Sequence, residues 1–122
     1  MKLIPWVVFL VLLAGCNGEK KKSDEAVREG YISQDSMTLI LTDVQVAEAA
    51  VAYLKNEGRE KDATDSAVTY YNRIFAKYKI RRARFEKSLK YYQSDPDQFF
   101  RMEEKVMENL SRKQSENSVS KE

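Results

Sequence analysis

Apolar residues recur at intervals of three and four in the first half of the chain, and no other feature constrains the fold as strongly. They are Met37, Ile40, Leu41, Val44, Ala47, Val51 and Leu54. In an α-helix these positions share one face, because the helix completes a turn every 3.6 residues. Ser33 or Asp35 can cap the start, and Gly58 follows the last apolar position. We therefore expect a long helix over 33–56 that buries this face.

Three further helices are expected, each from its own apolar spacing. The second, over 65–79, carries Val68, Tyr71, Ile74, Phe75 and Tyr78; the third, over 82–93, carries Phe85, Leu89 and Tyr92; the fourth, over 96–112, carries Phe99, Met102, Val106 and Leu110. Thr64 or Asp65 can cap the second helix. Asp95 and Pro96 mark the start of the fourth, with Asp at the cap and Pro at the first helical position. No segment alternates long enough for a strand, so the sequence predicts a small all-α bundle of about four helices.

The first residues have the three-part layout of a secretory signal. Lys2 supplies a positive charge, residues 3–13 are apolar, and the small residues Ala14 and Gly15 precede Cys16. The apolar run is too short for a membrane-spanning helix, which needs about 20 residues. Cys16 is the only cysteine, so it forms no disulfide within the chain.

The quartet Leu13-Ala14-Gly15-Cys16 resembles the lipobox of bacterial lipoprotein precursors. The resemblance implies that a signal peptide over 1–15 is removed and that Cys16 carries diacylglycerol, with palmitate among the attached acyl chains. Two or three acyl chains anchor a protein stably to a membrane. It also implies a location in the bacterial cell envelope, facing the periplasm, and Asn17 favours the outer over the inner membrane. The alternative is an ordinary secretory signal with a buried, inert cysteine.

The chain is long enough for one domain, which we expect over residues 31–112. Residues 16–30 lack an apolar period and are interpreted as a lipidated cysteine followed by a flexible tether. The lysines at 20–22 can attract anionic headgroups or simply be part of a solvated spacer. Residues 113–122 lose the apolar positions and are expected to be a disordered tail.

A second resemblance covers about residues 31–112. Its motifs are Met37, Ile40-Leu41-x-Asp43, Ala47-Glu48-Ala49, Ile74-Phe75-x-Lys77-Tyr78, Phe85-x-x-Ser88-Leu89-x-Tyr91-Tyr92 and Pro96. The pattern resembles the family called domain of unknown function 4296, which consists of small bacterial lipoproteins. The resemblance implies a helical domain at the envelope and brings no assigned activity. The sequence departs from the family pattern at Arg81, where a Ser or Thr cap is usual.

The sequence offers no constellation for catalysis. It contains no histidine, which excludes Ser-His-Asp and Cys-His sites within this chain. Its four glycines are isolated, so no Gly-rich phosphate loop is present. Carboxylate pairs such as Asp62/Asp65 and Asp95/Asp97 stand at expected helix starts, where negative charge offsets the helix dipole. We therefore expect no enzyme activity, no catalytic residue, no cofactor and no metal site.

Positions 73–90 hold eight basic residues and a single acidic one, whereas residues 33–54 of the expected first helix carry Asp35, Asp43 and Glu48 and no basic residue. Aromatic residues are also dense here, and some of them fall off the apolar stripe. The candidate interaction surface consists of Arg81, Arg82, Arg84, Lys87, Tyr70 and Tyr91. Opposed patches of this kind fit an intramolecular match, a dimer contact or a partner surface. The simplest interpretation is a solvated helix face that the first helix partly neutralises.

These observations favour a non-enzymatic protein-interaction module that is held at the membrane by lipid on Cys16. The alternative is a chaperone-like or lipid-handling protein with an apolar groove between its short helices. The expected partners are the membrane, an unidentified envelope protein or a second copy of the chain. A nucleic-acid partner is not expected, because the net charge is only +2 and the chain carries an export signal.

Overall fold

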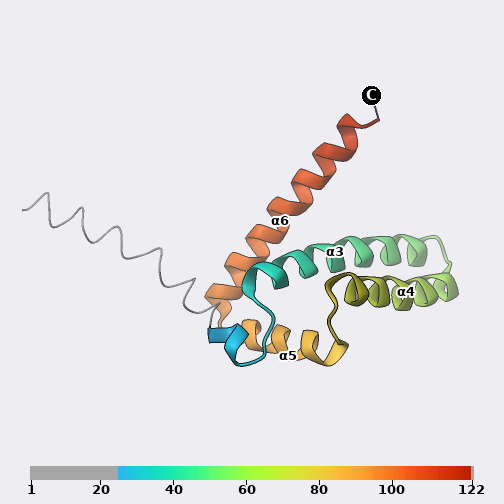
Figure 1. The fold of residues 1–122 in the computed structure, drawn as a ribbon. Coiled ribbons are helices and arrows are strands. Elements are labelled where there is room, and N and C mark those ends of the chain that lie inside the picture. Colours follow the sequence, from blue (N-terminus) through green and yellow to red (C-terminus); the bar gives the residue numbers. More distant parts are fainter. Residues whose placement is uncertain (1–24, 122) are drawn as a thin grey trace, which may run out of the picture.

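The computed structural model describes residues 25–121, and four long helices make up most of this segment (Figure 1). They are α3 (Gln34–Asn56), α4 (Glu60–Tyr78), α5 (Arg82–Gln93) and α6 (Pro96–Val119). One more helical turn covers residues 25–28, and no strand occurs within residues 25–121. The predicted all-α class is confirmed.

Several predicted helix boundaries are confirmed by their caps. Ser33 caps α3, and its side chain accepts a hydrogen bond from the Ser36 amide at 3.3 Å. Asp95 caps α6 by accepting from the Gln98 amide at 3.2 Å, with a proline at the start of the helix. α5 has the predicted bounds although its cap, Arg81, makes no side-chain capping bond.

The second helix begins five residues earlier than predicted, at Glu60 rather than 65. The Thr64 hydroxyl donates to the Glu60 carbonyl oxygen at 3.0 Å, so it lies inside the helix instead of capping it. The connection between α3 and α4 is therefore only residues 57–59, where Gly58 has a φ of 74°. That left-handed conformation suits glycine and allows a short reversal between α3 and α4.

The predicted disordered tail is wrong over residues 113–119, because α6 continues to Val119. No glycine or proline interrupts this stretch, and its Lys, Gln and Glu residues are good helix formers. Ser115 and Ser118 donate from their hydroxyl groups to carbonyls four residues earlier, which keeps their side chains on the helix surface. In Figure 1 this end of α6 projects away from the other helices.

The expected tether over 16–30 is wrong for its last residues, which belong to the folded domain. Ala26 is fully buried, and its carbonyl oxygen accepts from the Tyr31 amide at 2.9 Å. Ile32 is also buried. The signal peptide, Cys16 and the rest of the predicted tether lie outside the described residues.

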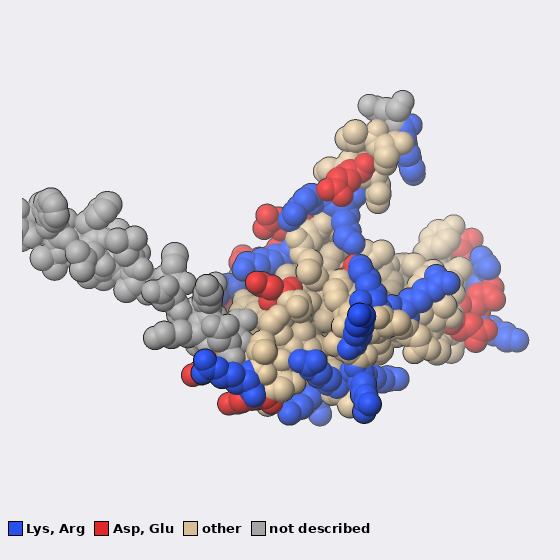
Figure 2. Space-filling model, viewed as in Figure 1, with Lys and Arg blue, Asp and Glu red and all other residues tan. Residues whose placement is uncertain are grey.

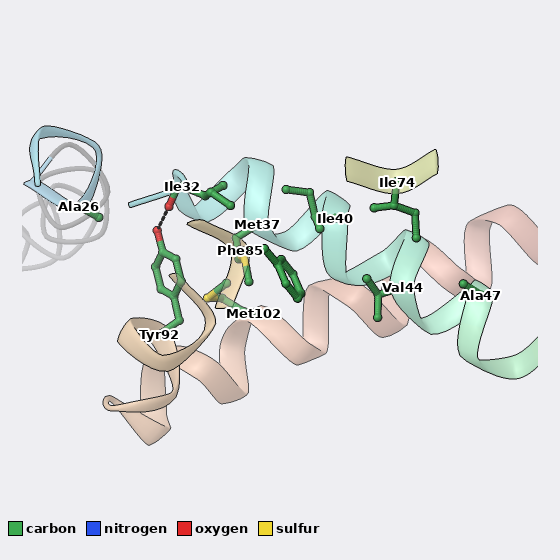
Figure 3. Close-up of a cluster of buried hydrophobic side chains, with 10 residues drawn as sticks. All are labelled: Ala26, Ile32, Met37, Ile40, Val44, Ala47, Ile74, Phe85, Tyr92 and Met102. Atoms are coloured by element: carbon green, nitrogen blue, oxygen red, sulfur yellow. Dashed lines mark hydrogen bonds between the residues drawn. The ribbon is translucent and has the colours of Figure 1, made fainter. Parts of the chain in front are cut away.

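The core forms where α3 meets the other helices (Figure 3). α3 packs against α4 and α6, and α5 packs against α6. The buried cluster consists of Ala26, Ile32, Met37, Ile40, Val44, Ala47, Ile74, Phe85, Tyr92 and Met102. The predicted apolar face of the first helix is therefore the face that supplies the centre of the core.

α3 is long and apolar enough to cross a membrane, by length and composition alone. The core helix of a soluble protein passes the same test. In this fold Met37 and Ile40 of α3 are fully buried against protein, and Asp43 is paired with lysines from α4 and α6. α3 is therefore the central helix of the bundle.

Candidate functional site

Three members of the candidate interaction surface converge on the segment that precedes α3. The ring of Tyr91 stacks on that of Tyr31, with centroids 4.2 Å apart and planes inclined by 19°. The Lys87 ammonium lies 4.7 Å from the centroid of the Tyr31 ring. Arg84 donates to the carbonyl oxygens of Gly30 at 3.2 Å and of Tyr31 at 3.4 Å. These side chains thus hold residues 30–31 against α5.

The other three members lie elsewhere. Arg82 pairs with Glu86 through an Nε–Oε1 distance of 3.0 Å and lines a groove on the other side of α5. Arg81 is exposed at the start of α5, and Tyr70 is half-buried on α4. The structure therefore does not bring the six predicted residues into one patch.

A pair of α5 side chains that the sequence did not single out as a site captures the backbone of Ile32. The Ile32 amide donates to Ser88 Oγ at 2.9 Å, and Tyr92 donates from its hydroxyl group to the Ile32 carbonyl oxygen at 2.5 Å. Burial raises the pKa of Tyr92 to about 12, with smaller contributions from Tyr91 and Asp35. The only sign of this pair in the sequence was that Ser88 and Tyr92, four residues apart, both belong to the family-like motif.

The opposed charges noted in the sequence meet at one point, Asp43 of α3. Its carboxylate accepts from Lys77 at 2.8 Å, from Tyr78 at 2.7 Å and from Lys113 at 3.2 Å. Burial alone would raise the pKa of Asp43, but these three hydrogen bonds outweigh it and hold the pKa below its ordinary value. The intramolecular pairing of opposite charges is therefore found for Lys77, which contacts Asp43 of α3. The hydrogen bonds and ion pairs of residues 25–121 link no other basic residue of positions 73–90 to an acidic side chain of α3.

Side chains of α4 and α5 line a mainly apolar groove. Figure 1 shows these two helices joined by the connection at 79–81. The groove has a volume of about 500 Å³. Its lining consists of Ala67, Val68, Tyr71, Asn72, Phe75, Arg82, Phe85, Glu86 and Leu89. Val68 is 60% exposed, so a large apolar side chain meets solvent at this groove. In the sequence, a groove between short helices was part of the alternative interpretation as a chaperone-like or lipid-handling protein, and its position came only from the structure.

Aromatic contacts fix the floor of this groove. The rings of Phe75 and Phe85 lie 5.5 Å apart between centroids, and those of Tyr71 and Phe75 lie 6.0 Å apart. The Tyr71 hydroxyl donates to Glu48 at 3.0 Å, and burial together with this carboxylate raises the pKa of Tyr71. A second hollow of about 270 Å³ shares Tyr71, Phe85 and Leu89 and continues toward α6. The two hollows therefore lie next to each other and share these three side chains.

Within residues 25–121, no group of three or more His, Cys, Asp or Glu side chains is placed to hold a metal ion. In each of the two carboxylate pairs, one member has a structural partner. Asp62 binds Arg59 at 2.8 Å, and Asp95 caps α6. The features that stand out for recognition are therefore the apolar groove and the basic face of α5.

A family model described as Domain of unknown function (DUF4296) matches residues 29–116. This match confirms the second resemblance seen in the sequence. No curated protein and no solved structure matches the chain.

Proposed function

The chain belongs to the family Domain of unknown function (DUF4296), and from this premise we propose that it is a lipid-anchored protein of the bacterial envelope that serves as a non-enzymatic protein-interaction module. The Leu13-Ala14-Gly15-Cys16 quartet supports the anchor and the location. The groove between α4 and α5 supports the interaction role, because its lining is mainly apolar and exposes Val68 to solvent.

The occupant that fits this groove is one apolar helix face of a partner protein. The α4 wall runs from Ala67 to Phe75, which is about 12 Å at 1.5 Å per residue. Two turns of a helix, with side chains at i, i+3, i+4 and i+7, match that length. Small apolar grooves of this kind receive amphipathic helices in many complexes.

The groove also fits the second candidate function, a chaperone-like or lipid-handling protein that holds an apolar peptide or acyl chain. The observation in its favour is the apolar connection through Tyr71, Phe85 and Leu89 to the second hollow. Against it, the groove is an open surface, and the polar Asn72, Arg82 and Glu86 stand in its lining. A short helix can satisfy those polar groups better than a hydrocarbon chain can.

The anchor is tested by replacing Cys16 with serine and supplying labelled palmitate to the cells. Because serine offers no sulfur for the diacylglycerol thioether, we expect no label in the variant and accumulation of uncleaved precursor. The unchanged chain is the positive control. Incorporation of label at the same level in the variant contradicts the lipobox interpretation.

The groove is tested by placing a photo-crosslinking amino acid at Val68 or at the neighbouring exposed Thr69. Adjacent helix positions diverge by about 100°, so only the first probe should reach the groove. We expect a discrete protein crosslink from position 68 in envelope samples, and its loss when Leu89→Glu places a charge in the groove. Crosslinking to lipid instead supports the second candidate function, and equal crosslinking from both positions contradicts a groove-based role.

A further inference from the structure

The outward face of α5 is basic and points away from the groove. Lys87 follows Phe85 by two residues and precedes Leu89 by two, which places it about 160–200° around the helix from both groove residues. Lys87, Lys90 and Arg84 are exposed. Figure 2 shows Lys and Arg side chains gathered along the edge of the molecule where α5 lies.

The same face receives the chain segment that leads toward Cys16. Tyr91 and Lys87 both pack on the Tyr31 ring, and Arg84 donates hydrogen bonds to the carbonyl oxygens of Gly30 and Tyr31. Glu25 follows Cys16 by nine positions. Even fully extended, they span about 30 Å, at roughly 3.3 Å per residue. A lipid on Cys16 would therefore hold Glu25, and with it the segment that packs against α5, within about 30 Å of the bilayer.

Acidic residues near this face reduce its charge without reversing it. Glu25 and Glu29 lie close enough to Tyr91 to raise its pKa, after the larger effect of burial, and Glu86 is paired with Arg82. Residues 25–31 and 81–93 together hold six basic and three acidic residues. Residues 17–24, which follow Cys16, hold the three lysines at 20–22 and two acidic residues, Glu19 and Asp24.

We propose that the outward face of α5, centred on Lys87 and Lys90, docks on the anionic headgroups of the membrane in which Cys16 is anchored. This inference rests on the proposed lipid anchor and adds an orientation to it. Basic residues near an anionic leaflet are attracted to it, and an anchor removes most of the entropic cost of finding the surface. Docked in this way, the domain leaves the groove between α4 and α5 open to a partner.

The test uses the acylated full-length protein in vesicles, with a single fluorescent label at Ala83→Cys or at Ala52→Cys. Both alanines are exposed, the first on α5 and the second near the far end of α3. Cys16 is blocked by its thioether, so the new thiol is the only labelling site. Quenching by spin-labelled lipid headgroups then reports which position lies at the bilayer surface.

In vesicles containing about 30% phosphatidylglycerol, we expect stronger quenching at position 83 than at 52. Salt at about 1 M, where the Debye length is about 3 Å, should remove the difference. The variant K87Q/K90Q should lower the ratio of docked to undocked protein about 25-fold, or about fivefold for each charge removed. The matched control K55Q/K61Q removes the same charge from exposed positions near the α3–α4 connection and should leave the ratio unchanged.

Two negative results have different meanings. Protein that stays bound to vesicles but shows equal quenching at both positions, or no response to K87Q/K90Q, overturns the docking of α5 and leaves the anchor intact. Protein that does not sediment with vesicles at all overturns the anchor and the docking together. Stronger quenching at position 52 places the opposite end of the domain at the membrane and also overturns the proposal.

Discussion

Tyr92 donates from its hydroxyl group to the carbonyl oxygen of Ile32 over 2.5 Å, across 60 positions of sequence. One turn earlier on α5, Ser88 accepts from the amide of the same residue. Both polar groups of the Ile32 backbone are therefore satisfied by α5 in a buried region where water is excluded. This clamp fixes where the N-terminal segment enters the domain.

Tyr92→Phe is expected to lower the free energy of unfolding by about 1–2 kcal/mol at pH 7, because the Ile32 carbonyl loses its donor inside the protein. Chemical denaturation followed by far-UV circular dichroism measures the change. Tyr53→Phe is the matched control, since Tyr53 is 64% exposed, and it should have no measurable effect. An equal loss in both variants would mean that the clamp contributes nothing specific.

The same variant should change the alkaline stability profile. The folded-state pKa of Tyr92 is about 12, above the ordinary value of 10. Because the Tyr92 hydroxyl keeps its proton more strongly in the folded state, it contributes stability that is fully present below pH 10. This contribution is lost as the pH rises toward 12, because the tyrosine of the unfolded chain loses its proton first. Stability should therefore fall less steeply between pH 10 and 12 in Tyr92→Phe than in the unchanged chain. Parallel profiles would contradict this assignment.

Ser88→Ala is expected to lower the free energy of unfolding by about 1–3 kcal/mol, because it leaves the buried Ile32 amide without an acceptor. Ser94→Ala serves as the control, since Ser94 is exposed and bonds only to carbonyl oxygen of its own helix turn. Thermal melting of the two variants measures the difference. Hydrogen exchange should also accelerate at the Ile32 amide in Ser88→Ala alone.

Asp43→Asn should destabilise the bundle by about 1–2 kcal/mol at pH 7, because the charged acceptor for two lysines and a tyrosine is lost. The pKa of Asp43 is lowered in the folded state, so its contribution is present above the ordinary carboxyl pKa of about 4 and disappears as the pH falls through the folded value. The two proteins should therefore converge in stability in acid. The exposed Glu108→Gln change should show neither effect.

Lys79→Gly is expected to raise stability by about 0.5–1 kcal/mol. Lys79 ends α4 with a φ of 53°, a left-handed conformation that costs energy for any residue with a Cβ and little for glycine. Lys105→Gly, in the exposed middle of α6, should have the opposite effect and cost about 1 kcal/mol. Denaturant midpoints compare the two, and a loss of stability in Lys79→Gly would contradict the strain.

The positions of the helices were largely predictable because they depend on local interactions. Apolar spacing placed α3 and α5, and the caps Ser33 and Asp95 marked two starts correctly. The predicted start of the second helix was wrong, because a threonine can either cap a helix or lie inside it. Thr64 looked like a cap, yet its hydroxyl bonds inside α4 and the helix extends to Glu60.

The candidate surface was harder to predict because residue type does not reveal a distant partner. Arg84 and Tyr91 looked like free recognition residues, and the fold uses both to hold residues 30–31. Arg82 belongs to the groove instead. Their separation around α5 follows from helix geometry, but which side meets the N-terminal segment depends on packing.

By itself, the sequence determined the all-α class, the central apolar helix and the lipobox-like quartet before Asn17, since each is written in a short stretch of neighbouring residues. Only the tertiary structure decided that Ser88 and Tyr92 clamp Ile32, that Asp43 gathers two lysines, and that α4 and α5 leave a groove open. These contacts join residues 34 to 70 positions apart. The spacing of apolar residues indicates which face of a helix is apolar. Which helix packs against that face depends on the packing of all the helices together.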